Sequence, residues 1–378
     1  MLPGEQLKPA SANLSINIRK RFSADREFSL QAQFEALPGF TILFGPSGAG
    51  KTTLLNCIAG LATPDEGRIV IGERVLFDSD VRVNLAISKR GIGYVLQELA
   101  LFPHLTVEEN AEFGLALLGR AERHQRVAKM LREFRVDHLG KQRPSEISGG
   151  ERQRVALARS IVTDPCVLLL DEPLAALDAA TKSKIIDDLR GWNLVHRVPI
   201  LYVTHSREEV MALGERVLVI DGGRIIAQGT PHDVLEAPLQ ETVAQLAGFE
   251  NVLDARVESV HVDRGTMTCR LLNGDASSDV VLETPLIRAV VDSHLRIGIR
   301  AGDILLATAN PVGLSARNIL TGHIVQLQRR DMIICARVSC GVEMEAYLTL
   351  AARDALQLAE GCKVWLVIKT HSCHLMQK

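Results

Sequence analysis

The stretch GPSGAGKTT, residues 45–53, decides the fold of this chain. It follows the apolar run FTILF and precedes a helical pattern, which is the strand–loop–helix context that a phosphate-binding loop requires. Glycines let backbone N–H groups curve around phosphates without Cβ clashes, and a helix N-terminus favours negative charge. The stretch therefore predicts a nucleotide site. The residues of its loop are Gly45, Pro46, Ser47, Gly48, Ala49, Gly50, Lys51, Thr52 and Thr53.

Four side chains have specific roles in the predicted site. Lys51 reaches the β- and γ-phosphates, and the Thr52 hydroxyl ligates Mg²⁺. The run CVLLLDEP predicts a buried strand that ends in Asp171 and Glu172, and ligands bind at such carboxyl ends. Asp171 is placed to hold Mg²⁺ through water, and Glu172 to polarise a water beyond the γ-phosphate. The alternative, a surface acidic pair, leaves their place beside a phosphate loop unexplained.

The run ISGGERQR, residues 147–154, repeats this chemistry at a second place. Ser148, Gly149 and Gly150 open a predicted helix 97 residues after Lys51, so a hydroxyl and backbone N–H groups again meet at a helix N-terminus. One nucleotide needs only one such segment within a subunit. The second segment therefore suggests a site that another subunit completes.

Length and composition exclude several classes of protein. The 378 residues allow two or three domains, and a net charge of −2 implies no broad affinity for nucleic acid or anionic lipid. No apolar run approaches the roughly 18 residues of a membrane span, and the N-terminus has no signal-peptide pattern. The seven cysteines form no CxxC pair, which favours reduced thiols over a metal site.

Hydrophobic patterning divides the chain in two. Apolar strands alternate with helical segments up to about residue 240, which predicts an α/β phosphate-loop NTPase with a mostly parallel sheet. A helical insertion at about 97–160 interrupts it, where Thr106 and Glu109 fit a capping box. From 250 to 378 short alternating strands predict a small all-β, OB-like barrel module or a tandem of two.

In their order and spacing, the phosphate loop, SGGE and LLLDEP resemble the ATP-binding subunit of an ABC transporter, over about residues 12–240. The resemblance implies an ABC ATPase with a helical subdomain. It also implies a head-to-tail homodimer that holds two ATP molecules between each phosphate loop and the opposing Ser148–Glu151 segment. The nucleotide-contacting residues of that segment are Ser148, Gly149, Gly150 and Glu151.

The same resemblance assigns roles to four further residues. Gln97 matches the glutamine that contacts Mg²⁺ and the attacking water, and His205 matches the switch histidine at the γ-phosphate. Asp178 lies in the D-loop, in which Ala175 replaces a commoner serine, and Phe22 matches the aromatic residue that stacks on adenine. Without the family pattern, His205 and Phe22 would equally fit structural roles beside strands.

The resemblance extends to importers. The run ALFPHLTVEENAEFGL is similar to the importer segment that receives a coupling helix of the permease. The implied partners are integral membrane permease subunits and, indirectly, a periplasmic or extracellular binding protein for the cargo, with no nucleic acid. The implied location is peripheral, on the cytoplasmic face of the inner membrane.

The C-terminal residues of the chain indicate which kind of cargo is imported. GLSARNILTG (313–322) and GCKVWLVIKTHS (361–372) resemble the Mop/TOBE module of molybdate importer ATPases, over about residues 290–378, with a Mop-like unit at 313–378. A tetrahedral dianion prefers hydroxyl and backbone donors beside fixed cations. The residues that would supply them are Ser315, Ala316, Arg317 and Lys369, with Asn318 on the same turn. The resemblance implies ATP-driven import of molybdate, with tungstate as a related cargo. The indirect partner would then be a periplasmic or extracellular molybdate-binding protein.

Other hypotheses stay open at this point. The cargo could be sulfate, polyamine or iron, with a barrel that serves only dimerisation, and SARN could simply cap a turn. A soluble ABC ATPase of translation or DNA repair would need a second cassette or a coiled-coil insertion, and the sequence has neither. A pure storage or sensor module would not need the intact ATPase motifs. Residues 250–290 carry no functional signal.

Overall fold

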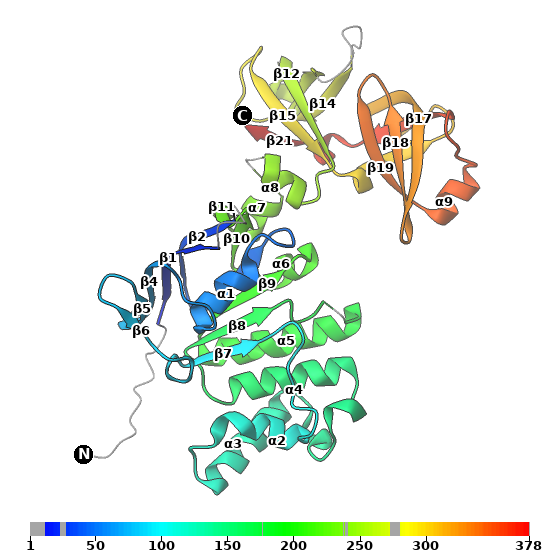
Figure 1. Ribbon diagram of the computed structural model, residues 1–378. Helices are drawn as coiled ribbons and strands as arrows, with labels where there is room; N and C mark the ends of the chain where they lie inside the picture. Colours follow the sequence, from blue (N-terminus) through cyan, green and yellow to red (C-terminus); the bar gives the residue numbers. More distant parts are fainter. Residues whose placement is uncertain are drawn as a thin grey trace. The chain divides into compact units, whose positions relative to one another are not determined.

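The computed structural model describes residues 12–22, 28–175, 177–236, 238, 241–272 and 280–377. Contacts divide the chain into two compact units, Met1–Pro231 and His232–Lys378, which are described separately (Figure 1). The helix α8 (Glu241–Leu246) thus belongs with the β-rich unit, ahead of the first strand of that unit.

In the described part of the first unit, eleven strands form one sheet in the order β6-β5-β4-β1-β2-β11-β10-β3-β9-β8-β7. The strands are β1 (Leu14–Arg21), β2 (Ser29–Ala36), β3 (Gly39–Phe44), β4 (Glu66–Ile71), β5 (Arg74–Asp78), β6 (Val83–Asn84), β7 (Ile92–Val95), β8 (Val167–Asp171), β9 (Pro199–Thr204), β10 (Arg216–Asp221) and β11 (Arg224–Gly229). In the sheet, the strands from β10 to β7 are parallel, whereas neighbouring strands from β6 to β2 are antiparallel. Short turns join β4 to β5 and β5 to β6, which is the connection that antiparallel neighbours allow, whereas β1 and β4 are far apart in the sequence. The predicted mostly parallel sheet is therefore correct only for the half that carries the phosphate loop.

The helices of the first unit are α1 (Lys51–Ala59), α2 (Val107–Glu112), α3 (Arg120–Glu133), α4 (Gly149–Ile161), α5 (Ala179–His196) and α6 (Arg207–Leu213). Its 3₁₀ helices are η1 (Ile87–Lys89), η2 (Phe113–Leu115), η3 (Asp137–Leu139) and η4 (Pro144–Glu146). The helices α2, α3 and α4 pack on one another as a group (Figure 1). The capping box of Thr106 and Glu109 is confirmed at the start of α2, but α2 is shorter than its apolar pattern suggests because η2 follows it directly.

Every residue of β8 and β9 is buried. A strand covered on both faces appears as an unbroken apolar run, which is why CVLLLD and PILYVT lie at the centre of the sheet. Because these two strands are parallel neighbours, the residues at their carboxyl ends meet at one edge. This register brings Glu172 and His205 together beside the phosphate loop at the end of β3.

The second unit contains two five-stranded sheets, β14-β13-β12-β15-β21 and β16-β20-β17-β18-β19, in its described part (Figure 1). The strands are β12 (Asn251–His261), β13 (Thr266–Leu271), β14 (Val281–Pro285), β15 (His294–Ile299), β16 (Leu305–Ala307), β17 (Asn318–Arg330), β18 (Ile333–Ser339), β19 (Glu343–Thr349), β20 (Lys363–Ile368) and β21 (His374–Gln377). The other elements are α7 (Pro231–Leu235, across the division), α8, η5 (Val262–Arg264), η6 (Ala301–Asp303), α9 (Leu350–Ala355) and η7 (Thr370–Ser372). We call the part built on β12–β15 the first β module and the part built on β17–β20 the second β module.

The two β modules exchange their last strands. Strands β12 to β15 form one module, but the strand that follows them, β16, pairs with β20 of the second module. In return β21, the last strand of the chain, pairs with β15 of the first module. Each sheet is therefore completed by the other half of the sequence, and neither half contains all five strands of one sheet.

Two buried asparagines join these sheets at equivalent places. Asn251, the first residue of β12, donates its amide to the Glu345 carbonyl (2.9 Å) and accepts from the Glu345 N–H (2.7 Å). Asn318, the first residue of β17, donates to the Glu283 carbonyl (2.9 Å) and accepts from the Glu283 N–H (2.7 Å). The Asn318 side chain thus bonds to protein backbone. Among the described residues no helix is long and apolar enough to cross a membrane.

Candidate functional site

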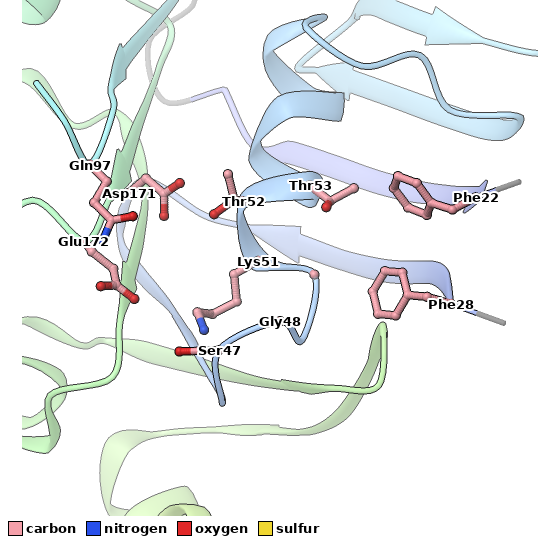
Figure 2. A pocket seen from close by; sticks show the side chains of 11 residues that line it. Phe22, Phe28, Ser47, Gly48, Lys51, Thr52, Thr53, Gln97, Asp171 and Glu172 are labelled. Atoms are coloured by element: carbon pink, nitrogen blue, oxygen red, sulfur yellow. The ribbon is translucent and has the colours of Figure 1, made fainter. Parts of the chain in front are cut away.

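A pocket of about 570 Å³ opens at the phosphate loop of the first unit (Figure 2). Its lining residues are Phe22, Phe28, Ser47, Gly48, Gly50, Lys51, Thr52, Thr53, Gln97, Asp171 and Glu172. The sequence predicted a nucleotide or metal role for every one of them except Phe28. Residues from four distant segments of the sequence therefore converge on one cavity.

Backbone geometry holds the phosphate loop in place. Gly45 tolerates no side chain, because a Cβ there would lie 2.1 Å from the Ile220 carbonyl oxygen. Gly50 precedes α1 with a φ of 103°, a left-handed conformation that favours glycine. The Lys51 ammonium is buried and donates to the carbonyls of Gly45 (2.9 Å) and Pro46 (2.8 Å). Burial lowers the pKa of Lys51. Its ammonium lies inside the loop, where an anion would bind.

The acidic pair faces this lysine across the pocket. Asp171 ends β8, and burial raises its pKa against the opposing effect of a hydrogen bond from the Thr52 hydroxyl. Glu172 has a φ of 44°, and its N–H donates to the Val203 carbonyl (3.1 Å). This strained turn directs the Glu172 carboxylate into the pocket (Figure 2), 3.3 Å from Nδ1 of His205. A carboxylate and an imidazole thus meet where a nucleophilic water could be activated.

Two aromatic rings form the opposite side of the pocket (Figure 2). The rings of Phe22 and Phe28 lie 5.7 Å apart between centroids and are tilted by 48°. The phosphate loop lies between these two rings and Glu172 (Figure 2). Phe28 was missed in the sequence, although the β1–β2 pairing of Arg21 with Ser29 makes these two phenylalanines neighbours across the hairpin. A base stacked on these rings would be held at its faces.

The oxygen-rich side of the pocket suits a hard cation. The Thr52 hydroxyl, the Asp171 carboxylate and the Gln97 amide all line it. No group of three or more metal-ligating acidic, cysteine or histidine side chains occurs among the described residues. Mg²⁺ fits such a site, since it is commonly held by few protein ligands together with waters and substrate phosphates.

The remaining predicted nucleotide residues lie outside this pocket. Ser148 caps α4, and its hydroxyl donates to the Glu151 carboxylate (2.7 Å) in a capping box. Gly150 lies against α5, where a Cβ would approach the Thr181 side chain to 2.6 Å. Asp178 caps α5 by accepting from the Thr181 N–H (3.0 Å), and hydrogen bonds from Thr181 lower its pKa. Within one chain, the Ser148–Glu151 segment and Asp178 therefore do not contact the pocket.

Two of the tail residues predicted for oxyanion binding, Arg317 and Lys369, lie at neighbouring strand ends in the second unit. Strands β17 and β20 pair Asn318 with Ile368, so Arg317 and Lys369 continue this pairing at the end of the two strands. The side chains of Ser315, Arg317 and Lys369 are exposed. Among the described residues, neither cation forms an ion pair. Two uncompensated cations at neighbouring strand ends are suited to a small dianion.

Known proteins match most of the chain. A family model for the ABC transporter matches residues 34–175, and one for the TOBE domain matches residues 314–375. The chain is 38% identical over 366 residues to the molybdenum import ATP-binding protein ModC of Rhizobium meliloti (strain 1021), which covers 94% of this chain and 98% of that protein. It is 36% identical over 332 residues to the molybdate/tungstate import ATP-binding protein WtpC of Pyrococcus abyssi (strain GE5 / Orsay), covering 87% and 90%.

A solved structure is similar to the nucleotide-binding part. It is the dimeric, post-hydrolysis state of the ATP-binding cassette MJ0796 bound to ADP and Pi, with 28% identity and a TM-score of 0.51. The match covers 58% of this chain and 98% of that one. Because relatives this similar align over nearly their full lengths, the chain belongs to the family of ABC transporter ATP-binding proteins whose members include the molybdenum import protein ModC.

Proposed function

We propose that this chain is the ATP-hydrolysing subunit that powers import of molybdate, and of tungstate as a related oxyanion, through a separate membrane permease. The observation that carries the ATPase is the Glu172 carboxylate, which lines a pocket together with Lys51 and two aromatic rings and lies 3.3 Å from Nδ1 of His205. Relatives named for molybdenum or molybdate/tungstate import, and aligned over the tail as well as the ATPase, support the cargo.

Each side of the pocket has a distinct task in this proposal. Adenine stacks on Phe22 and Phe28, and the triphosphate follows the loop to Lys51. Glu172 accepts a proton from the attacking water, while His205 orients the carboxylate and the γ-phosphate. The ligands for Mg²⁺ would be Thr52, Asp171 and Gln97, and the ion would neutralise charge on the phosphates.

A second copy of the chain completes the site. The Ser148–Glu151 segment presents a hydroxyl and backbone N–H groups that do not reach the pocket of their own chain. In the proposed head-to-tail homodimer, this segment and Asp178 approach the ATP of the partner. ATP closes the dimer and hydrolysis opens it, which drives the permease between two states at the cytoplasmic face of the membrane.

Replacement of Glu172 by glutamine tests the ATPase assignment. The amide keeps the shape of the side chain but cannot accept the proton, so turnover should fall by at least ~10²-fold while ATP binding persists. The substitution Glu122→Gln on α3, outside the pocket, is the matched control. ATP-dependent dimers should accumulate in the Glu172→Gln variant and can be measured by light scattering. Wild-type turnover in that variant would remove Glu172 from the mechanism.

The tail is proposed to bind oxyanion as a cargo sensor. Ser315, Arg317 and Lys369 supply the hydroxyl and the cations, and the Ala316 N–H adds a backbone donor. Calorimetric titration of the full chain with molybdate, tungstate and sulfate tests this role. A heat of binding with molybdate that is lost in the Arg317→Gln variant supports the sensor role. No heat of binding with any of the three oxyanions contradicts it. Uptake of molybdate by the chain reconstituted with its permease tests the cargo; uptake of sulfate instead would favour the alternative importer.

A further inference from the structure

The two β modules of the second unit place equivalent residues at equivalent positions. In the first module Asn251 pairs with Ile299 between β12 and β15, and in the second Asn318 pairs with Ile368 between β17 and β20. Each asparagine side chain then donates one hydrogen bond to the backbone of the opposite sheet and accepts one from it. The residues flanking these pairs can therefore be matched one to one.

The matched positions differ in charge. Glu250 precedes Asn251, whereas Arg317 precedes Asn318. After the paired strands, Arg300 matches Lys369. These two residues share one backbone conformation, with φ and ψ of −75° and 138° for Arg300 and −71° and 145° for Lys369. The fold thus presents the same local frame twice, with an acidic residue in one copy and a basic residue in the other.

In the first module this frame is filled by the chain itself. The Glu250 carboxylate accepts from the Ala301 N–H (2.8 Å). The Arg300 guanidinium lies over the Phe249 ring, 4.3 Å from its centroid, and the centroid of the His374 ring lies 4.8 Å from that of Phe249 at an interplanar angle of 64°. A carboxylate, a cation and two aromatic rings therefore occupy the space, and the backbone amide is satisfied internally.

In the second module the same frame is open. Ala316 stands at the position of Phe249, and Arg317 at the position of Glu250. Thr370 matches Ala301, and its backbone N–H has no acceptor among the described residues. The Lys369 side chain is exposed beside it. No carboxylate of the described residues takes the place that Glu250 takes in the first module, so the acceptor for this N–H comes from solution, as water or as an anion.

We propose that the first module contains a closed copy of the oxyanion site, in which the Glu250 carboxylate takes the place of the ligand. Glu250 and Phe249 then limit each chain to a single site for a tetrahedral dianion, in the second module. This inference rests on the proposed oxyanion binding by the tail. It names the residues that decide where a dianion binds and where it is excluded.

Exchange of the two residues tests the proposal. In Phe249→Ala/Glu250→Arg the first module receives the residues of the second, and calorimetry of the full chain with molybdate should give two sites per chain, against one in the wild type. The variant with Arg317→Gln added should retain one. Fluorescence of Trp365 in a Trp192→Phe background, measured in urea, checks that the second unit stays folded.

Four outcomes separate the two proposals. One site in both wild type and variant overturns the closed-site inference and leaves oxyanion binding intact. Two sites in the wild type overturn the inference as well. No site in the wild type but one in the variant removes the tail's sensor role and overturns the single site in the second module, and supports only the closed copy in the first module. No site in either chain overturns both.

Hydrogen exchange of the unmodified chain gives an independent readout that does not depend on folding of a variant. The Ala301 amide should exchange slowly with or without molybdate, because Glu250 already accepts its hydrogen bond. The Thr370 amide should exchange quickly and become protected only when molybdate is added. Equal behaviour of the two amides, or new protection at Ala301 on titration, would overturn the inference.

Discussion

The buried carboxylate of Glu209 connects the segment that carries His205 to a neighbouring helix. It is only 4% exposed and accepts hydrogen bonds from the hydroxyls of Tyr202 (2.9 Å) and Thr204 (2.8 Å) on β9. Its other oxygen pairs with Nζ of Lys182 on α5, at 3.1 Å. Since Thr204 directly precedes His205, this carboxylate holds the position of the histidine at the pocket.

Replacement of Glu209 by glutamine should therefore affect both stability and turnover. The amide oxygen can still accept from the hydroxyls, but the charge opposite Lys182 is lost. Removing one partner of a fully buried pair costs about 3–5 kcal/mol. The Lys182 side chain is 24% exposed and can regain water, which reduces the expected loss to about 2 kcal/mol.

Urea unfolding measures this loss directly. The chain has two tryptophans, Trp192 in the first unit and Trp365 in the second, so Trp365→Phe leaves one reporter of the ATPase unit. With a slope of roughly 2 kcal/mol per molar, the midpoint should fall by about 1 M. The control Glu122→Gln removes an exposed pair with Arg126 and should change stability by less than about 0.5 kcal/mol.

Turnover distinguishes positioning from simple destabilisation. In conditions where the Glu209→Gln variant is folded, kcat should fall roughly tenfold because His205 is displaced from Glu172, while KM for ATP stays unchanged because the loop and aromatic rings are intact. A joint fall of kcat and rise of KM, or unchanged kcat with the full stability loss, would refute the reasoning and leave Glu209 a structural residue.

Three further predictions concern other parts of the molecule. Asn318→Ala leaves the N–H and carbonyl of Glu283 without partners and should destabilise the second unit by about 3 kcal/mol, measured by urea unfolding with the single tryptophan of that unit; a loss below about 1 kcal/mol would show that water replaces the amide. Burial lowers the pKa of His374, so the unfolded chain binds more protons at this residue and the second unit should lose stability as the pH falls through 6.5. The stability of the His374→Leu variant should fall less steeply over this pH range, and an unchanged slope would contradict the prediction. Gly45→Ala puts a Cβ 2.1 Å from the Ile220 carbonyl and should abolish ATP binding in equilibrium dialysis, so normal binding would show that the loop can shift.

Much of the nucleotide site could be predicted because its determinants are local. A phosphate loop needs a strand, a glycine-rich turn and a helix in immediate succession, so residues 45–53 contain both the ligand groups and the geometry that presents them. The same holds for Asp171 and Glu172, which follow directly from a buried apolar strand. The role of Phe28 required the pairing of β1 with β2, a contact that the apolar pattern around it did not specify.

The sequence by itself determined the ATPase fold, the chemistry of its pocket and the resemblance of the tail to an oxyanion module. Only the tertiary structure decided how the tail residues are used. Asn318 lies beside Arg317 in the sequence, yet it is buried and bonds to Glu283, whereas Arg317 is exposed. The exchange of β16 and β21 and the internal hydrogen bond of Glu250 likewise join residues about 50 or more positions apart. Such contacts depend on strand register and burial, which are set when distant segments pack and not by any single stretch of sequence.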